Sequence, residues 1–434
     1  MSKKPLSNPL SGYQELLPRE QKLFSSLMNT IESVYQKNGF IQIDQPMIDR
    51  TDSLLANVGG DTTKELMHLQ RPEDDPHGQA LRFDLTVPLA RYVANNYGQL
   101  TFPFRRYAIG KVFRGERPQA GRFREFYQCD IDIIGNESLS VRHDAEIILL
   151  IAELFNELNT QFTTGDYVIR YNNRKLINEF LDCINVRNSL KVIRILDKKN
   201  KLSNEVFISE LKELNLDKTQ IRNITHYLSA NTIENIVELL PNDSQGLKEL
   251  QTVQNILEVS DYFSSTFKLD LSIARGLDYY TGTVFETELI DHPDVGSVCS
   301  GGRYDDLASA YTNKKLPGVG MSIGLTRLFD RLLKKDVLAL PEQITATRVA
   351  IAPMTDDFTL AFEVKQLLNE NNLPCEILFS EQKFDKKMNY IDKQGIPYAL
   401  IIGEDEIRDE VVTLKNMGTG DQVRIGIDKL LAAL

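Results

Sequence analysis

Positively charged side chains are concentrated in residues 104–126. Seven residues of this stretch are Lys or Arg and two are Glu, so it carries +5 in a chain whose net charge is −11. A local positive island in an acidic protein indicates that a polyanion binds there. A solvated charged hairpin is the alternative. It is disfavoured because Arg114 and Arg124 lie in runs that alternate like half-buried strands.

The same stretch predicts the element that would position these arginines. Apolar residues lead into Arg114, a polar loop with Pro118 and Gly121 follows, and an apolar run returns through Phe126. This pattern is typical of two strands joined by a long hairpin loop. We therefore expect arginines at both ends of a hairpin.

Polar side chains alternate with apolar ones directly after the hairpin. Gln128, Asp130 and Asp132 are separated by Cys129 and Ile131. A period of two places the three polar side chains on one face of a strand. Carboxylates on a sheet are costly to bury without a cationic or hydrogen-bonding partner, so this face either meets water or binds something.

Residues 80–98 predict a strand, a break and a short helix, with Pro88 in the first helical turn and Gly98 as a cap. Asp84 and Thr86 come where the strand ends. Two interpretations stay open: these side chains point at a ligand, or one of them caps the helix. From this stretch alone the cap is favoured.

Several stretches together resemble the class II aminoacyl-tRNA synthetases, and within them the histidyl-tRNA synthetase family. Phe113–Phe126 resembles motif 2 of these enzymes, and Gly318–Arg327 resembles motif 3. Residues 39–48, which follow a predicted helix, show a weaker resemblance to motif 1. Two signature stretches resemble the histidine-specific family. They are Arg-Gly-Leu-Asp-Tyr-Tyr at Arg275–Tyr280 and Gly-Gly-Arg-Tyr-Asp at Gly301–Asp305.

The resemblance covers the chain from about Leu10 onward and implies an α/β multidomain fold. We expect a catalytic domain over residues 1–335, built on the class II antiparallel β-sheet flanked by helices, with a helical insertion at about 166–263. A mostly parallel α/β domain is expected over 345–434 from its alternating apolar strands and helices. The resemblance identifies it as an anticodon-binding domain, although its ten Lys/Arg and fifteen Asp/Glu show no basic face.

The activity implied is that of a histidine–tRNA ligase, with L-histidine, ATP accompanied by Mg²⁺, and tRNA(His) as partners, in a homodimer. The alternative is a non-catalytic paralogue that regulates histidine biosynthesis. Such relatives usually lack the C-terminal domain and lose catalytic positions. This chain retains Arg114, Arg275 and Arg327, which favours the enzyme.

The resemblance also assigns site residues. Arg114 and Arg275 are expected to be catalytic, by stabilising charge on the α-phosphate. ATP binding is expected from Arg114, Glu116, Arg122, Phe126 and Arg327. Histidine binding is expected from Asp84, Thr86 and Gln128 at the ammonium, Asp132 and Tyr280 at the imidazole, and from Arg275 and Tyr279. Thr326 replaces the acid that many class II enzymes carry before the last arginine of motif 3, so no metal contact is implied there.

Length and composition set further bounds. A chain of 434 residues predicts two or three domains. Its longest apolar run, Ile147–Ala152, is too short to span a membrane, and no signal peptide is recognisable. The four cysteines lie far apart without a Cys-x-x-Cys pair. We therefore expect no zinc site and a reduced, cytoplasmic protein.

Overall fold

The computed structural model describes residues 8–56, 65–69, 78–119, 121–199, 202–230, 232–262, 266–274 and 279–434. The chain forms two compact units: the larger includes Ser26–Ala339, and the smaller combines Leu16–Ser25 with Leu340–Leu434. No helix of the described residues is both long enough and apolar enough to cross a membrane.

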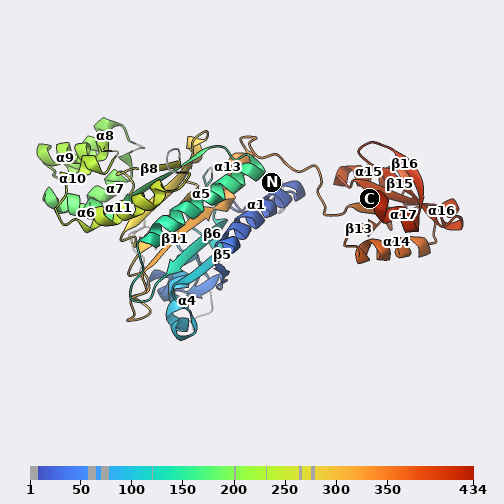
Figure 1. The fold of residues 1–434 in the computed structure, drawn as a ribbon, viewed down its shortest axis with the longest axis horizontal. Coiled ribbons are helices and arrows are strands. Elements are labelled where there is room, and N and C mark those ends of the chain that lie inside the picture. Colours follow the sequence, from blue (N-terminus) through green and yellow to red (C-terminus); the bar gives the residue numbers. More distant parts are fainter. Residues whose placement is uncertain are drawn as a thin grey trace, which may run out of the picture. The chain divides into compact units, whose positions relative to one another are not determined.

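An eight-stranded sheet forms the centre of the larger unit (Figure 1). Its order is β1-β5-β6-β11-β10-β9-β7-β8, and neighbours are antiparallel except for the two outermost pairs. This confirms the expected antiparallel architecture. The strands are β1 (Ile41–Gln42), β5 (Phe104–Phe113), β6 (Glu125–Ile134), β7 (Tyr167–Asn173), β8 (Phe267–Leu269), β9 (Thr283–Leu289), β10 (Cys299–Tyr304) and β11 (Gly318–Gly324).

The predicted hairpin is present as β5 and β6, which pair from Phe104↔Ile134 to Phe113↔Glu125. Helices α1 (Pro18–Lys37) and α5 (Arg142–Phe162) lie together on one face of the sheet (Figure 1). The Thr30 hydroxyl of α1 donates to Gln161 of α5 at 2.7 Å. The Tyr35 hydroxyl donates to the backbone carbonyl of Cys129 in β6 at 3.1 Å. The opposite face is therefore left for a ligand.

A smaller sheet has the strand order β2-β4-β3, and the residue after β4, Arg82, accepts a 2.9 Å hydrogen bond from the Phe113 backbone N–H at the end of β5. Helix α4 starts at Thr86, which places Pro88 in its first turn as predicted, but it ends at Asn96. Gly98 lies in a following 3-10 turn and is not the cap residue. The elements are β2 (Ile48–Arg50), α2 (Thr51–Leu55), β3 (His68–Leu69), β4 (Gln79–Leu81), α4 (Thr86–Asn96) and η1 (Tyr97–Gln99).

The expected helical insertion becomes helical later than residue 166. Residues 167–173 form β7, because this segment pairs with β9 from Tyr167↔Leu289 to Asn173↔Thr283. The helices between β7 and β8 are α6 (Arg174–Cys183), α7 (Ser189–Leu196), α8 (Asn204–Glu213), α9 (Lys218–Ser229), α10 (Glu234–Val237) and α11 (Gln245–Glu258). Since β7 and β8 are parallel, these helices make the crossover connection between them.

Two elements follow β9 and β11 in the larger unit, η3 (Pro293–Val295) and α13 (Leu325–Leu333). The smaller unit has a five-stranded sheet in the order β13-β12-β14-β15-β16. Its first three strands are parallel, as expected, and the last two add antiparallel pairs. Its elements are β12 (Val349–Pro353), α14 (Thr359–Glu370), β13 (Cys375–Ile377), α15 (Phe384–Gln394), β14 (Tyr398–Ile402), α16 (Glu404–Arg408), β15 (Val411–Asn416), β16 (Gln422–Gly426) and α17 (Ile427–Ala433).

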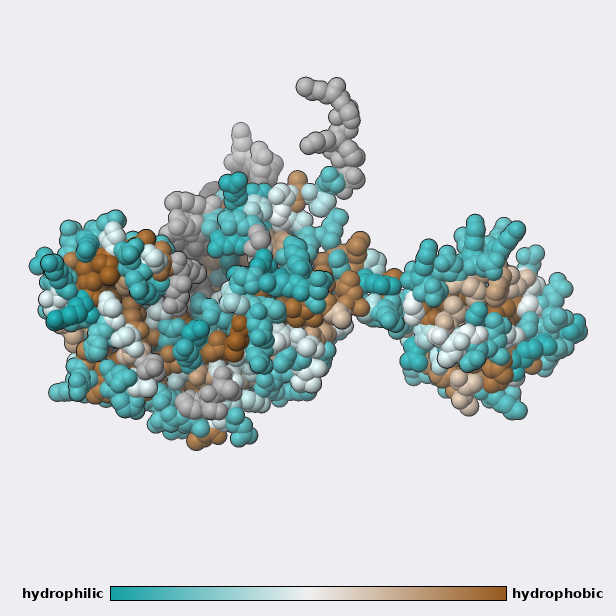
Figure 2. Space-filling model, turned by 90° about the horizontal axis from the view of Figure 1, so that it is seen from above, coloured by the Kyte–Doolittle hydropathy of each residue, from teal (hydrophilic) through white to brown (hydrophobic). Residues whose placement is uncertain are grey.

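The face seen in Figure 2 is mostly polar, with smaller hydrophobic areas on it. This distribution is usual for a folded protein that exposes scattered apolar residues.

Candidate active site

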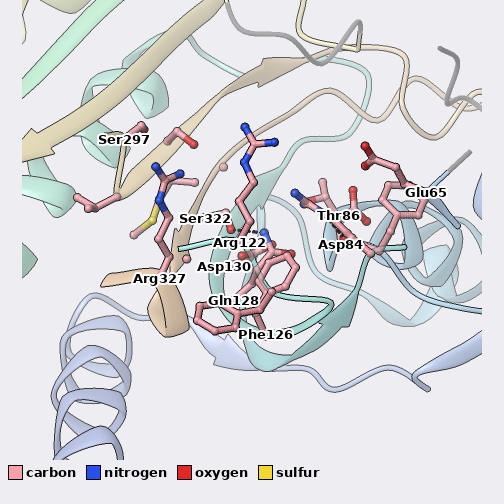
Figure 3. A pocket seen from close by; sticks show the side chains of 18 of the residues that line it. Glu65, Asp84, Thr86, Arg122, Phe126, Gln128, Asp130, Ser297, Ser322 and Arg327 are labelled. Carbon is pink, nitrogen blue, oxygen red and sulfur yellow. Dashed lines mark hydrogen bonds between the residues drawn. The ribbon is translucent and has the colours of Figure 1, made fainter. Parts of the chain in front are cut away.

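Strands β6 and β11 form the floor of a cavity of about 600 Å³ in the larger unit. Gln128, Asp130 and Asp132 all line it, which confirms that they share one face of a strand. Figure 3 labels Gln128 and Asp130 in the cavity. The register places Gly324, Ser322 and Gly320 of β11 opposite them in turn. The floor therefore alternates polar side chains on one strand with small residues on the next.

Glycine is required where the floor is most crowded. A Cβ added at Gly320 would overlap the Asp132 Oδ1 atom and would approach the backbone oxygen of Ile131 to 2.5 Å. A Cβ at Gly302 of β10 would approach the Tyr280 ring to 2.9 Å. The glycines of the two glycine-rich stretches thus make room for the polar side chains.

Asp132 is held by two buried groups. Its Oδ2 atom lies 2.6 Å from Arg106 Nη2, and its Oδ1 accepts a 2.7 Å hydrogen bond from the Tyr304 hydroxyl. Arg106 is fully buried and also donates to the Leu85 carbonyl at 2.8 Å. Burial raises the pKa of Asp132 to about 6, although Arg106 opposes the shift. The contacts with Arg106 and Tyr304 together fix the Asp132 carboxylate in one orientation.

Gln128 and Asp130 are linked through Ser322. The Gln128 Nε2 donates to the Ser322 Oγ at 2.8 Å, and the Ser322 side chain also hydrogen-bonds Asp130. Burial raises the pKa of Asp130 to about 7. Within the described part of the chain, neither Gln128 Oε1 nor Asp130 Oδ1 has a hydrogen-bond partner. Both oxygen atoms can therefore accept a hydrogen bond from a ligand.

Asp84 forms a hydrogen bond to the first turn of α4 and also lines the cavity. Its Oδ1 accepts a 3.0 Å hydrogen bond from the Val87 backbone N–H in the first turn of α4, and its side chain also lines the cavity with Thr86. Burial raises the pKa of Asp84, with the Val87 bond opposing the shift. The hydrogen bond from Val87 thus fixes the Asp84 carboxylate where it faces the cavity.

Cationic groups from the hairpin and from α13 line the same cavity. Arg114 donates from Nε to the Phe83 carbonyl at 3.2 Å, and its guanidinium lies 5.1 Å from the centre of the Phe126 ring. Arg327 donates from Nη2 to the Val295 carbonyl at 2.6 Å. Burial lowers the pKa of Arg327, and the neighbouring charge of Arg122 adds to the shift.

The ends of the hairpin loop are joined by an ion pair. Arg122 Nη1 lies 3.2 Å from Glu116 Oε2, and both residues line the cavity. Arg122 is the more exposed partner, with 57% of its side chain accessible against 20% for Glu116. Arg122 is therefore the arginine that is freer to turn toward a ligand.

Tyr279 and Tyr280 close one side of the cavity, with ring centres 4.6 Å apart. Arg275, which precedes them in the signature stretch, lies outside the described residues. Every other residue predicted for the site lines this one cavity. The described residues contain no group of three or more His, Cys, Asp or Glu side chains that could hold a metal ion.

The signature arginine of Gly301–Asp305 has a structural role. Arg303 Nη2 lies 2.7 Å from Asp144 Oδ1 at the start of α5, and the guanidinium also donates to the carbonyls of Leu139 and Ser140. Sequence reasoning overlooked Asp130 and Ser322 as site residues. The period-two pattern marked Asp130, but Ser322 had no signal beyond its place in the glycine-rich stretch.

Comparison with known proteins covers the whole chain. Residues 12–328 match the family model described as Histidyl-tRNA synthetase, and residues 348–434 match the model described as Anticodon binding domain. A curated histidine–tRNA ligase from Clostridium tetani is 44% identical over 99% of this chain and 98% of its own length.

Two solved structures extend the comparison. The histidyl-tRNA synthetase of Nostoc sp. PCC 7120 superposes with a TM-score of 0.85 at 36% identity and 100% coverage of both chains. A Bacillus halodurans protein, described as an ATP phosphoribosyltransferase regulatory subunit/histidyl-tRNA synthetase, superposes with a TM-score of 0.76. It is 21% identical and covers 93% of this chain and 99% of its own, which shows a shared fold alone.

Proposed function

Because the chain belongs to the histidyl-tRNA synthetase family, we infer that it is a histidine–tRNA ligase, which joins L-histidine to tRNA(His) and consumes ATP. The observation that carries this inference is that the similarity to a curated ligase extends over nearly the full length of both proteins. The similarity to a curated ligase spans 99% of the chain, including both the unit with the cavity and the C-terminal unit. A regulatory paralogue has weaker support, since the structural relative of that description is only 21% identical.

We propose a two-step reaction in the cavity. The histidine carboxylate attacks the α-phosphorus of ATP, giving histidyl-adenylate and pyrophosphate. A hydroxyl of the terminal adenosine of tRNA(His) then attacks the adenylate carbonyl, and AMP leaves. Negative charge grows on the phosphoryl oxygens in the first step, so fixed cations lower its barrier. Arg114, anchored by the Phe83 carbonyl, is proposed for this role together with Arg275.

ATP is proposed to lie between the hairpin and α13. Phe126 is proposed to stack its ring on the adenine, and Arg327, which lines the same cavity, is proposed to contact the γ-phosphate. Arg122 and Glu116 are proposed to contact the nucleotide from the loop. Mg²⁺ is proposed to enter with ATP and to neutralise phosphate charge.

Histidine is proposed to lie along β6. Asp84, Thr86 and Gln128 are proposed to receive the α-ammonium, while Asp132 and Tyr280 receive the imidazole nitrogens beside Tyr279. Support comes from the fixed orientation of Asp132, whose oxygens are already held by Arg106 and Tyr304. A site of oriented polar groups rejects analogues that lack the matching atoms by roughly 10⁴–10⁵.

The remaining partners belong to the same proposal. The C-terminal unit, proposed as residues 345–434, would contact the tRNA anticodon, and the catalytic part would span 1–335 with its helical insertion. A homodimer is proposed through the region of β1, whose Ile41 is 57% exposed at the edge of the sheet, with Ile48 46% exposed nearby. We propose that the enzyme acts in the cytoplasm.

Histidine-dependent exchange of labelled pyrophosphate into ATP tests the function. The enzyme should exchange with L-histidine and should fail with each of the other standard amino acids. Charging of a tRNA(His) transcript tests the second step. A folded protein that binds histidine but supports neither reaction would favour the regulatory paralogue and refute the ligase.

A further inference from the structure

A buried carboxylate that the steps above leave without a role lies in the middle of the cavity floor. Asp130 is only 2% exposed and lies between Gln128 and Asp132 on the cavity face of β6. Figure 3 shows Asp130 together with Gln128 and Ser322. Among the residues that the structure describes, its Oδ1 atom has no hydrogen-bond partner and its carboxylate has no ion-pair partner. A buried charge of this kind is costly unless something pairs with it.

The hydrogen bonds around Ser322 have a direction. Gln128 Nε2 donates to Ser322 Oγ at 2.8 Å, so the hydroxyl hydrogen is left to donate to the Asp130 carboxylate. Gln128 is thereby oriented with its amide nitrogen toward Ser322 and its Oε1 away from it. Gln128 Oε1 and Asp130 Oδ1 are thus two unsatisfied acceptors on residues that line the same face of β6.

The charges around this point favour a cation. Arg106 lies near Asp130 but pairs directly with Asp132 at 2.6 Å. Arg82 also acts on Asp130, yet its guanidinium hydrogen-bonds the carbonyls of Gln45 and Lys111. Within the described chain, no ion pair is formed by Asp130 or its buried neighbour Asp84, although Arg106 acts on both carboxylates from a distance and Arg114 acts on Asp84.

We propose that Asp130 is a further residue of the amino-acid site, where its carboxylate accepts a hydrogen bond from the α-ammonium group of histidine beside Gln128 Oε1. The proposal rests on the function inferred above, because it takes histidine as the ligand. An ammonium has three donors, which Asp130 would share with the three acceptors proposed above. The imidazole would then contact Asp132, two residues further along β6 on the same face.

Ionisation of Asp130 is consistent with this role. Burial raises its pKa to about 7, Arg106 opposes the shift, and the carboxylates of Asp132 and Asp84 add to it. A cation that binds against the carboxylate stabilises its charged form and lowers this pKa again. Histidine binding should therefore displace any proton that Asp130 carries in the empty site.

The test combines one substitution with ligands that differ by one group. Asp130→Asn keeps the shape of the side chain and removes its charge. Calorimetry would measure the binding of histidine, histidinol, and 3-(imidazol-4-yl)propanoate, which lacks the ammonium. The variant should bind histidine and histidinol roughly ten- to a hundredfold more weakly, the range for a hydrogen bond to a charged group, and should bind the propanoate within about threefold of wild type.

Asp132→Asn is the matched control on the same strand. Because the imidazole is common to all three ligands, this substitution should weaken them alike. Equal losses for all three ligands in Asp130→Asn, or no loss for any, would overturn the role at the ammonium. Retained binding of the propanoate shows that the cavity is intact. Failure of the wild-type protein to bind histidine at all would instead refute the proposed function.

Discussion

Replacing Arg303 by methionine should destabilise the larger unit by about 3–5 kcal/mol, the range for breaking one side of a buried ion pair. Only 3% of Arg303 is exposed and Asp144 is fully buried. The guanidinium contacts both Asp144 oxygens, at 2.7 Å and 3.1 Å, and two backbone carbonyls. Methionine fills similar space but leaves the carboxylate without its partner.

The loss should depend on pH. Burial already raises the pKa of Asp144, and Arg303 opposes that shift. Without the arginine the pKa rises further, so Asp144 takes up a proton more readily in acid and escapes part of the cost. The destabilisation should consequently be larger at pH 8 than at pH 5.

Urea unfolding followed by far-ultraviolet circular dichroism is the suitable assay, because the chain has no tryptophan whose fluorescence could report on unfolding. Asp144→Leu and the double variant complete a cycle. If the pair acts as a unit, the double variant loses less stability than the two single losses added together. Additivity within about 0.5 kcal/mol would show that Arg303 and Asp144 do not depend on each other and would refute the reasoning.

Three further predictions concern the cavity. Arg114→Ala should lower pyrophosphate exchange by about 10²–10³, and a loss below tenfold in a folded variant would contradict the role given to this arginine. Gly320→Ala should abolish histidine binding measured by calorimetry, because the added Cβ overlaps Asp132 Oδ1; unchanged affinity would contradict the crowding described. The Asp130 pKa rises from 3.8 to about 7, so the folded state keeps a proton that the unfolded state loses. Stability without ligand should therefore fall between about pH 4 and pH 7, by roughly 4 kcal/mol from this group. Asp130→Asn should remove that slope from urea unfolding curves, and an identical slope in the variant would argue against the shift.

Strong periodic patterns made much of this fold readable from sequence. The hairpin of β5 and β6, helix α1 and the parallel strands of the C-terminal unit all follow local repeats of two or 3.6 residues. Strand β7 was missed because its identity depends on pairing with β9, more than a hundred residues later. Such a partner leaves no trace in a local window.

The candidate site shows the same division. Alternation correctly placed Gln128, Asp130 and Asp132 on one face, but it could not show which carboxylates would lack a partner after folding. That depends on Ser322, which is brought opposite by β11. The signature stretch Gly301–Asp305 likewise gave no hint of the structural role of Arg303. Alternation along β10 turns the Arg303 side chain away from the sheet face on which Tyr304 lines the cavity. The role of Arg303 follows only from its contact with Asp144 of α5.

The crossover between β7 and β8 limits how this enzyme could be shortened. A chain leaving β7 at Asn173 emerges at one end of the sheet, whereas β8 begins at the other end, because the two strands run the same way. A tight turn cannot join them, and at least a dozen residues must span the strand length. Engineers seeking a minimal version must therefore substitute another bridging segment for helices α6 to α11; cutting and directly splicing the flanking strands would reverse β8 or expel it from the sheet.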